Sequence, residues 1–265
     1  LIFGIGIGYI SIRYKNKAMN DAKDIASSNV REYANLIKSH MDEGFGIARG
    51  IAESLMVCED ELGEDAKNVQ IEILKKTLID NPSYVASFLQ WDLQDCDSTY
   101  KKEHGRRRYF CFRKHPIHKI SGSKRYLEIE TLEGLVDTSS YDPSNPFYII
   151  KENHTEFIID PYYYSYQSID QMPSSVPVVE NSILETTIII PIIKDDKFRA
   201  LSGVDIPLNH FGDIICDIKP FINSQAFLMS NNGTFVAYSD RKYLSNTFKS
   251  LFSSARTVYT SKIMF

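Results

Sequence analysis

Residues 185–208, ETTIIIPIIKDDKFRALSGVDIPL, decide the fold class. Two runs rich in apolar and β-branched residues, Thr186 to Ile193 and Arg199 to Ile206, flank the polar turn Lys194 to Lys197, which predicts two neighbouring antiparallel strands. The second run ends in an acid, Asp205. Burying a carboxylate without a partner is costly, so we expect Asp205 either to cap a following helix from an exposed turn or to be paired.

Further strands lie on both sides of this stretch. Runs rich in aromatic and β-branched residues, separated by polar turns, predict strands; these are Tyr84 to Leu93, Arg106 to Arg113, Tyr126 to Leu132 and Glu156 to Ile159. Farther on, Gln225 to Ser230 and Thr234 to Ser239 flank Asn231-Asn232-Gly233, and Asn-Gly between apolar runs is a strong hairpin signal. The chain is therefore rich in antiparallel strands.

Helices precede and interrupt the strands. From about Asn16 to Val57, apolar or small residues recur every three or four positions, which predicts one long amphipathic helix. A second helix is predicted from Glu64 to Ile79 and ends before Asn81-Pro82. Shorter helices are expected at 148–153 and from Pro207 to Asp217, with Pro207 in the first turn. The predicted class is α+β, a long helix followed by antiparallel sheets.

The N-terminal residues 1–12, LIFGIGIGYISI, are strongly apolar. They are too short to span a bilayer, which needs about 20 residues. We interpret them as the remnant of a transmembrane helix; the alternative is a buried strand or the start of a buried helix. We expect residues 13–57 to form a stalk helix that pairs with a second copy, which makes the protein a homodimer. The transmembrane helix would anchor it in the cell membrane. Residues 58–212 would form one module, and 213–265 a second, truncated one.

Composition excludes several classes of protein. The chain has 265 residues, 43% hydrophobic, with a formal charge of −4. It is globular rather than disordered, and its mild acidity argues against nucleic-acid binding. The sequence contains no G-x-S-x-G, H-E-x-x-H or phosphate-binding P-loop motif, so hydrolase, zincin and nucleotide-transfer activities have no local support. We expect no catalytic residue, no metal and no cofactor.

A basic run is the main local departure from this acidity. Residues 101–125 hold ten Lys or Arg and one acid. Arginines on one strand face can clamp a carboxylate or phosphate, but Arg107 alternates with Arg106 and Arg108, so the three cannot face one pocket. We therefore favour a solvated hairpin. Its His104, Cys111, His115 and His118 match no known zinc spacing.

The four cysteines constrain the cellular compartment weakly. Cys96 and Cys111 lie on neighbouring predicted segments and can form a disulfide in an oxidising compartment. We expect Cys58 and Cys216 to stay separate.

Aromatic residues gather in and after the predicted strands. In a half-open sheet they either line a ligand pocket or pack in the core. The aromatic candidates for a pocket lining are Trp91, Tyr109, Phe147, Tyr148 and Tyr162, with Tyr163 and Tyr164 beside them.

Three stretches resemble the double Cache (dCACHE) sensor domains of bacterial and archaeal transmembrane receptors. They are Thr155 to Tyr163, with its Pro-Tyr step; Glu185 to Leu208, with its Gly-Val-Asp-Ile turn; and Pro220 to Leu244, with its Asn-Gly hairpin. The resemblance implies a periplasmic or extracellular sensor with a membrane-distal and a membrane-proximal PAS-like module, joined through the membrane to a cytoplasmic output domain, such as a histidine kinase in a two-component system or a chemoreceptor signalling domain.

The resemblance also implies a ligand site. In amino-acid-binding members, an aromatic pair preceded by an arginine holds the ligand carboxylate, and the turn aspartate holds its amine. Phe147-Tyr148 matches the pair and Asp205 the acid. Asn145 stands where the arginine is expected, two residues before Phe147. An asparagine cannot make the charged bidentate clamp, so amine, carboxylate and other small ligands stay open beside α-amino acids.

The sequence thus predicts a non-catalytic sensor that binds a small molecule in the distal module, through Trp91, Tyr109, Phe147, Tyr148, Tyr162 and Asp205. The alternatives are a spacer or dimerisation domain that binds a partner protein, and an extracytoplasmic enzyme.

Overall fold

The computed structural model describes residues 2–57, 64–97, 99–113, 128–166, 182–222, 224–238, 244 and 246–247. By its internal contacts the chain divides into two compact units. The larger is Met41–Asn209, and the smaller combines Leu1–His40 with His210–Phe265. Helix α1 (Ile2–Val57) contributes residues to both units.

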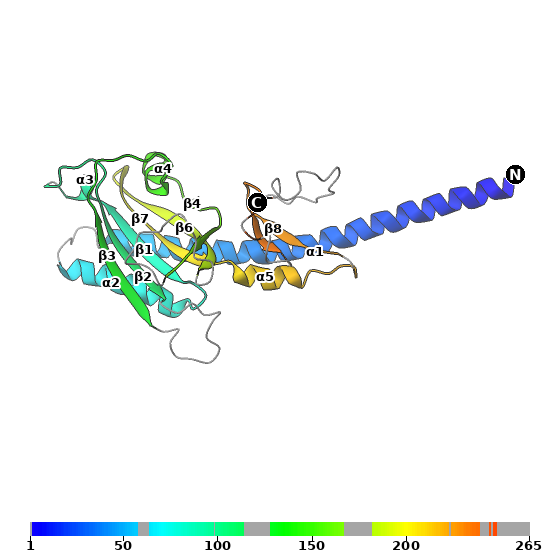
Figure 1. Cartoon of the computed structure of the whole chain (residues 1–265), viewed down its shortest axis with the longest axis horizontal. Coiled ribbons are helices and arrows are strands. Elements are labelled where there is room, and N and C mark those ends of the chain that lie inside the picture. The colour runs from blue at the N-terminus through cyan, green and yellow to red at the C-terminus, as the bar shows by residue number, and fades with distance from the viewer. Residues whose placement is uncertain are drawn as a thin grey trace. The chain divides into compact units, whose positions relative to one another are not determined.

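The larger unit is built on one antiparallel sheet (Figure 1). Its described strands follow the order β3-β2-β1-β7-β6-β4, and β5 also pairs with β6. The bounds are β1 Ala86–Asp92, β2 Arg106–Arg113, β3 Ile129–Val136, β4 Phe157–Ile158, β5 Tyr162–Tyr164, β6 Ile183–Lys194 and β7 Lys197–Pro207. The α+β class predicted from the sequence, with a long helix before an antiparallel sheet, is confirmed.

The β6–β7 hairpin forms the centre of this sheet. Its turn places Asp195 and Asp196 at φ values of 52° and 60°, the left-handed region that short hairpin turns require and that Asp tolerates. Pro191 lacks a backbone N–H, yet it is accommodated in β6 because the described partners of β6 on the side away from β7 pair only with residues up to Ile189.

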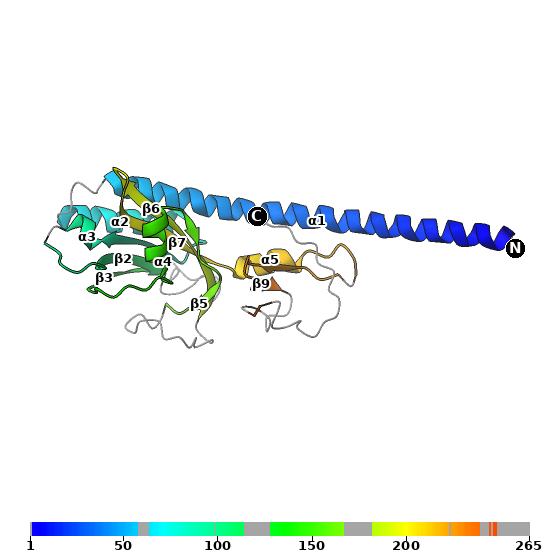
Figure 2. The same cartoon turned by 90° about the horizontal axis from the view of Figure 1, so that it is seen from above.

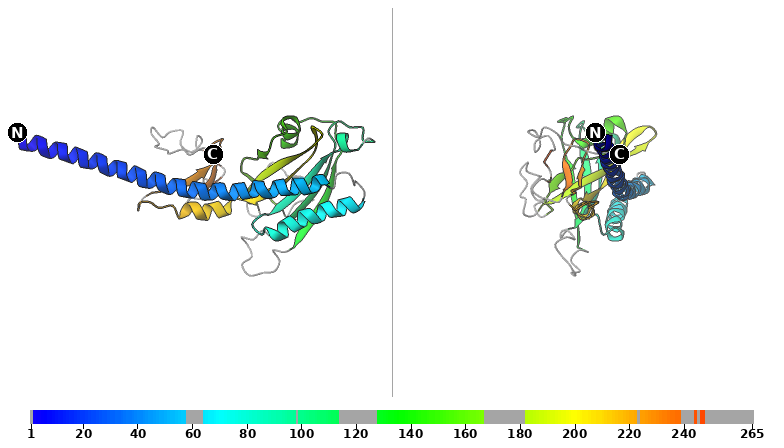
Figure 3. Two further views of the ribbon diagram at one scale, coloured as in Figure 1. Left: turned by 180° about the vertical axis from the view of Figure 1, so that it is seen from behind. Right: turned by 90° about the vertical axis from the view of Figure 1, so that its right-hand side faces the viewer.

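One face of the sheet is covered by helices. Residues 41–57 of α1 and the helix α2 (Glu64–Asp80) lie side by side against it (Figures 2 and 3). Ala48, Leu55 and Leu74 are fully buried there. A Cβ on Gly44 would lie 2.8 Å from the side chains of Ile188 and Ile206, so a glycine lets α1 approach the sheet closely.

The opposite face carries helix α4 (Pro146–Asn153). Asn145 begins the helix, because its side chain accepts a hydrogen bond from the Phe147 backbone N–H, and Pro146 stands in the first turn. Phe147 and Ile150 pack against Phe88 and Leu201 of the sheet. A short helix, α3 (Leu93–Cys96), follows β1.

The smaller unit contains α5 (Asn209–Cys216) and the hairpin of β8 (Phe227–Met229) and β9 (Phe235–Tyr238). Gly233 has φ +84° in the turn between the strands, a conformation that favours glycine. The Asn-Gly hairpin predicted from the sequence is confirmed.

Several predictions need correction. Pro207 is the last residue of β7 rather than part of a helix, and β3 runs on to Val136, beyond the predicted end at Leu132. Cys96 and Cys111 are not joined by a disulfide; the Cys111 thiol lies 3.6 Å from the Thr131 hydroxyl.

Several predictions fall wholly or partly outside the described residues, among them the prediction that Cys58 stays separate from Cys216. His115 and His118 of the candidate metal group lie there, as does the second half of the basic run. In the part of the chain that the structure describes, no three His, Cys, Asp or Glu side chains gather as a metal site would require. No helix in that part is both long enough and apolar enough to cross a membrane.

Candidate ligand-binding site

A cavity of about 480 Å³ opens on the α4 side of the sheet. Strand residues form its floor, and α4 with the segment around β5 forms its walls. The residues that line it are Phe88, Gln90, Arg106, Arg108, Phe110, Val136, Asn145, Pro146, Phe147, Ile159, Tyr162, Tyr164, Thr187, Ile189, Leu201 and Asp205. This combination of apolar walls with a few polar groups is typical of small-molecule sites.

The alternation of side chains along each strand selects these residues. In β2, Arg106, Arg108 and Phe110 face the cavity, and Tyr109 and Cys111 face the helices. In β7, Leu201 and Asp205 likewise lie on the cavity side. Because successive side chains of a strand point to opposite faces, only every second residue of each strand can reach a ligand here.

A buried hydrogen-bond network surrounds Asp205. The Thr187 hydroxyl donates to Asp205 Oδ1 at 2.7 Å, and since it has a single proton, Tyr162 donates to Thr187 across 2.6 Å. Tyr166 lies between the two acids of the network, with its hydroxyl 2.7 Å from Glu185 Oε2 and 3.2 Å from Asp205 Oδ2. Glu185 Oε1 is buried and has no hydrogen-bond partner among the described residues.

Burial changes the protonation of both acids. It raises the pKa of Asp205 to about 6, against the hydrogen bonds from Thr187 and Tyr166 and the charge of Arg108, which lower it. Burial also raises the pKa of Glu185 well above its usual range, and the charge of Asp205 adds to this shift. Burial therefore favours the protonated form of Glu185, and Asp205 is the acid whose pKa lies near 6.

The opposite end of the cavity is cationic. The Arg106 guanidinium lies 4.8 Å from the centre of the Phe147 ring and 5.5 Å from that of Tyr148. Burial lowers the pKa of Arg106, and the charge of Arg108 acts in the same direction. The cavity thus has a positive end at β2 and an acidic end at β6 and β7.

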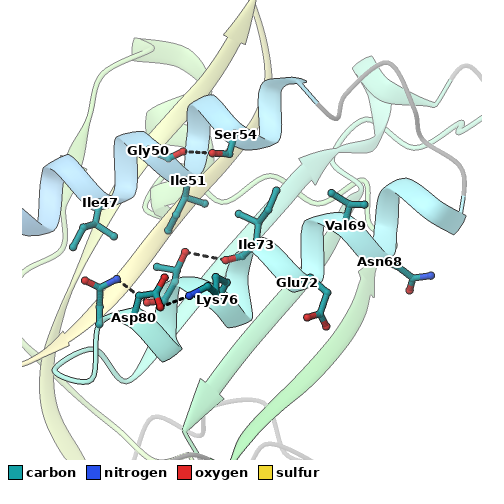
Figure 4. Close-up of a pocket in the computed structure, with 12 residues that line it drawn as sticks. Ile47, Gly50, Ile51, Ser54, Asn68, Val69, Glu72, Ile73, Lys76 and Asp80 are labelled. Carbon is teal, nitrogen blue, oxygen red and sulfur yellow. Dashed lines mark hydrogen bonds and ion pairs between the residues drawn. The ribbon is translucent and has the colours of Figure 1, made fainter.

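A second hollow, of about 680 Å³, lies between α1 and α2 (Figure 4). Its walls are largely apolar, with Ile47, Ile51 and Ile73 among them. The polar groups at its rim bond within their own helices: Ser54 donates to the Gly50 carbonyl and Lys76 pairs with Asp80. This hollow therefore offers a ligand fewer converging polar groups than the sheet cavity does.

Comparisons with known proteins identify the fold. The sequence matches no protein-family model and no curated protein. Among solved structures, the extracellular domain of the putative histidine kinase mmHK1S-Z2 is 20% identical, with a TM-score of 0.56 over 81% of this chain and 72% of that one. The ligand-binding domain of Mlp24 with asparagine is 13% identical, with a TM-score of 0.53 over 93% of this chain and 84% of that one.

A third structure is the ligand-binding domain of the Pseudomonas aeruginosa PAO1 amino acid chemoreceptor PctC in complex with GABA. It is 11% identical, with a TM-score of 0.52 over 83% of this chain and 76% of that one. The chain has the Cache-type fold of these domains. At identities this low, the likeness defines the fold and says nothing about the ligand of this chain.

The structure brings three of the sequence-predicted site residues together. Phe147, Tyr162 and Asp205 all lie on the cavity wall. Tyr148 lies beside it, with its ring against Arg106 and its hydroxyl 3.3 Å from the Ser140 carbonyl. Asp205 lies inside β7 and is paired, so of the two expectations for it, the exposed helix cap is wrong.

Trp91 and Tyr109 need correction. Both lie on the helix-covered face of the sheet, 2% and 3% exposed, in the core with α1 and α2. The Trp91 indole N–H donates to Gln70 Oε1 at 3.2 Å. Trp91 follows the cavity residue Gln90 on β1, and Tyr109 follows the cavity residue Arg108 on β2. Because successive side chains of a strand point to opposite faces, both point away from the cavity.

Sequence reasoning also missed residues of the site. Arg106 and Arg108 were assigned to a solvated hairpin, yet both line the cavity. Arg107 does face the other side of the sheet, as predicted. The same two-residue alternation of side chains places Arg106 and Arg108 together on the cavity side. Thr187 and Tyr166 gave no sequence signal, because their role comes from the pairing of β6 with β7 and from a distant loop.

Proposed function

We propose that this chain is the extracytoplasmic ligand-sensing domain of a transmembrane signalling receptor and that it binds a small molecule in the sheet cavity. The observation that carries the proposal is the buried acid pair of Asp205, which lines the cavity, and Glu185, which the Tyr166 hydroxyl connects to it. A buried carboxylate that ionises near pH 6 gains free energy from a cationic or hydrogen-bond-donating partner. An ammonium group on a ligand provides both properties.

The aromatic side chains support the same interpretation. Phe147, Tyr162 and Tyr164 line the cavity, and aromatic faces stabilise ammonium groups. Two structures with this fold hold small amines that carry a carboxyl group, GABA in PctC and asparagine in Mlp24. We extend a small-molecule ligand of this general kind to the present chain.

The signalling part of the proposal depends on helix α1. Its residues 41–57 pack directly beneath β6 and β7, which carry Glu185 and Asp205. A ligand that binds differently to two packings of this helix against the sheet would shift their populations. We propose that this shift passes along α1, in a membrane-anchored homodimer, to a cytoplasmic output domain.

Isothermal titration calorimetry of the folded chain against a panel of amines, amino acids, carboxylates, purines and sugars tests binding. We expect one class to bind, and Asp205→Asn to weaken that binding by about tenfold or more. Asp196→Asn is the matched control, because it makes the same change at the exposed β6–β7 turn and should leave binding unchanged.

A folded wild-type chain that binds no member of the panel would contradict the sensing proposal. It would instead favour a spacer or partner-binding domain. Turnover of a bound compound, followed by mass spectrometry, would contradict the non-catalytic part of the proposal.

A further inference from the structure

One ion pair joins helix α1 to the edge of the sheet. The Arg49 Nε donates to Glu156 Oε1 at 2.6 Å, and the Arg49 Nη2 donates to Glu156 Oε2 at 2.7 Å. The two residues are 107 positions apart in the sequence. The guanidinium also lies 5.5 Å from the centre of the Phe45 ring, one turn earlier on α1. A bidentate contact of this kind fixes the orientation of both planar groups, so it defines the position of Glu156 closely.

The alternation of side chains around β4 explains why Glu156 can reach α1. Glu156 stands directly before β4, and its neighbours Phe157 and Ile159 pack with the cluster on the α4 side of the sheet. Because successive side chains of an extended segment point to opposite faces, Glu156 points to the helix-covered side, where Arg49 meets it. Residues 156–159 therefore contact the cavity side of the sheet and helix α1 at the same time. We call them the wall segment.

The wall segment forms part of the proposed ligand cavity. Ile159 lines the cavity. Its backbone N–H donates to the Thr187 carbonyl at 2.9 Å, and its carbonyl accepts a hydrogen bond from the Thr186 hydroxyl at 2.6 Å. Thr187 in turn donates its hydroxyl to Asp205. A displacement of the wall segment would therefore move one residue of the wall and disturb the strand residue that bonds Asp205.

The pairing of the wall segment with the rest of the sheet is short. Strand β4 has two residues, which pair with Ile188 and Ile189 of β6, and it ends the described strand order. Short edge segments open at a low free energy. The side chains of the Arg49–Glu156 pair are 51% and 37% exposed, and exposed ion pairs contribute little to global stability. The pair can nevertheless set how often so short a segment opens.

We infer that Arg49 and Glu156 are positioning residues of the ligand cavity and that their ion pair holds the wall segment closed against the sheet. This inference rests on the proposed function, because the wall belongs to the cavity that we propose as the ligand site. It makes α1 part of the site, since a displacement of the helix at Arg49 releases the wall. By the same linkage, a ligand that needs the closed wall favours the position of α1 that keeps the ion pair.

Amide hydrogen exchange of the ligand-free chain, followed by NMR, tests the positioning directly. The reporter is the Ile159 N–H, which is bonded to the Thr187 carbonyl. We expect Arg49→Gln and Glu156→Gln each to raise its exchange rate about three- to tenfold. The double variant Arg49→Glu, Glu156→Arg exchanges the two charges and should restore a rate within about twofold of the wild type. Salt at about 1 M should bring the wild type towards the single variants, because exposed ion pairs are screened.

Lys102→Gln is the matched control. It breaks the Lys102–Asp137 pair, which is exposed to a similar degree, 46% and 49%, and lies next to β3 at the other end of the strand order. The exchange rate at Ile159 should not change in this variant.

Calorimetry of the same variants connects the wall to ligand binding. The probes are the panel of amines, amino acids, carboxylates, purines and sugars. We expect a compound that binds the wild type to bind Arg49→Gln and Glu156→Gln about three- to tenfold more weakly, because the closed wall is less populated. The charge-exchanged double variant should bind it about as tightly as the wild type does.

The outcomes separate this inference from the proposed function. Equal exchange at Ile159 in the wild type and the single variants would overturn the inference and leave the proposed function standing. The same holds if the double variant keeps the fast exchange of the single variants, or if exchange rises while affinity stays unchanged. Fast exchange in the single variants, with no compound bound by the folded wild type, would overturn the proposed function and with it the role of the pair in binding.

Discussion

Thr187 lies directly opposite Asp205 in the β6–β7 ladder, and its hydroxyl donates a 2.7 Å hydrogen bond to the Asp205 carboxylate. The same hydroxyl accepts a hydrogen bond from the Tyr162 hydroxyl. Thr187 therefore connects the cavity wall at β5 to the acid that we propose as the ammonium partner. Chains of hydrogen bonds of this kind polarise one another, so removal of the middle member affects both ends.

Thr187→Val should weaken ligand binding and raise the pKa of Asp205 further. Valine keeps the shape but removes the hydroxyl, so the buried carboxylate loses one of the hydrogen bonds that stabilise its charged form. We expect a loss of about 1–3 kcal/mol in the free energy of unfolding at neutral pH. Chemical denaturation measures it. Thr77→Val, which removes a hydroxyl bonded to the Ile73 carbonyl in the same helix, is the control and should cost less.

Ligand binding and stability should depend on pH in opposite directions. The pKa of Asp205 is raised from 3.8 to about 6 in the folded chain. Its contribution to stability is therefore fully present below pH 4 and is lost as the pH rises through 6. Burial raises this pKa, and the hydrogen bonds from Thr187 and Tyr166 and the charge of Arg108 lower it in part. Glu185 faces Asp205 across the Tyr166 hydroxyl.

An ammonium ligand needs the ionised form of Asp205, so its affinity should rise between pH 5 and 7. Calorimetry and thermal unfolding at half-unit pH steps measure both trends. In Asp205→Asn the two trends should be absent or strongly reduced over this range. An ammonium ligand whose affinity falls across the same range in the wild type would contradict the role of Asp205.

Much of the fold could be predicted from local pattern. The long helix, β2, the β6–β7 pair and the Asn-Gly hairpin follow from hydrophobic period and turn chemistry, which act over a few residues. The three residues of β5 could not be predicted in the same way. Tyr162 to Tyr164 form a strand only because β6 lies beside them, and such pairing depends on residues about twenty positions away in the sequence.

Part of the site could be predicted from the chemistry of a single residue. Asp205 is an acid in an apolar run, and such an acid needs a partner when it is buried. The prediction that Trp91 and Tyr109 line the cavity was wrong, because it rested on their aromatic character alone. The face of the strand on which each side chain lies was not part of it. Arg113 belongs to the run predicted as a solvated hairpin, yet it is 1% exposed. The carbonyl groups that accept its hydrogen bonds belong to Leu78, in the last turn of α2, and to Tyr84, before β1, both about thirty residues away in the sequence.

Gly203→Ala should destabilise the chain and distort the cavity floor. A Cβ at this position would lie 2.2 Å from the Ile188 carbonyl oxygen and 2.6 Å from the Phe88 ring. Since both neighbours belong to paired strands, we expect a loss of about 1–3 kcal/mol in the free energy of unfolding, measured by urea denaturation. Gly134→Ala on β3 is the control, because its Cβ would meet no atom within 4 Å. Equal stability of the two variants would contradict the close packing at Gly203.

Arg113→Met should destabilise the larger unit without affecting the charge of the cavity. The Arg113 Nε donates to the Tyr84 carbonyl at 2.9 Å, and its guanidinium also donates to the Leu78 carbonyl in the last turn of α2. Loss of both bonds leaves buried acceptors unsatisfied, so we expect a cost of about 3 kcal/mol. Lys76→Met removes an exposed cation from the same turn of α2 and should cost about 0.5 kcal/mol. A cost for Arg113→Met as small as this control would show that solvent replaces the lost donors.

The proposed pairing of α1 with a second copy predicts that charges on its exposed apolar residues prevent dimerisation. Ile12, Met19, Ile25 and Leu36 are each at least 44% exposed, and burial of such side chains in a dimer would gain about 25 cal/mol per Å² of apolar surface. The double variant Ile25→Glu, Leu36→Glu should shift the chain from dimer to monomer in sedimentation equilibrium. The matched control is Asn20→Glu with Asn35→Glu, which adds the same charge at exposed polar positions of the same helix that are not three or four residues from any of these four side chains. A wild-type chain that stays monomeric at about 100 μM would contradict the proposed pairing. Even a weak dimer, of the kind that tethering of two chains would support, should be partly populated at that concentration.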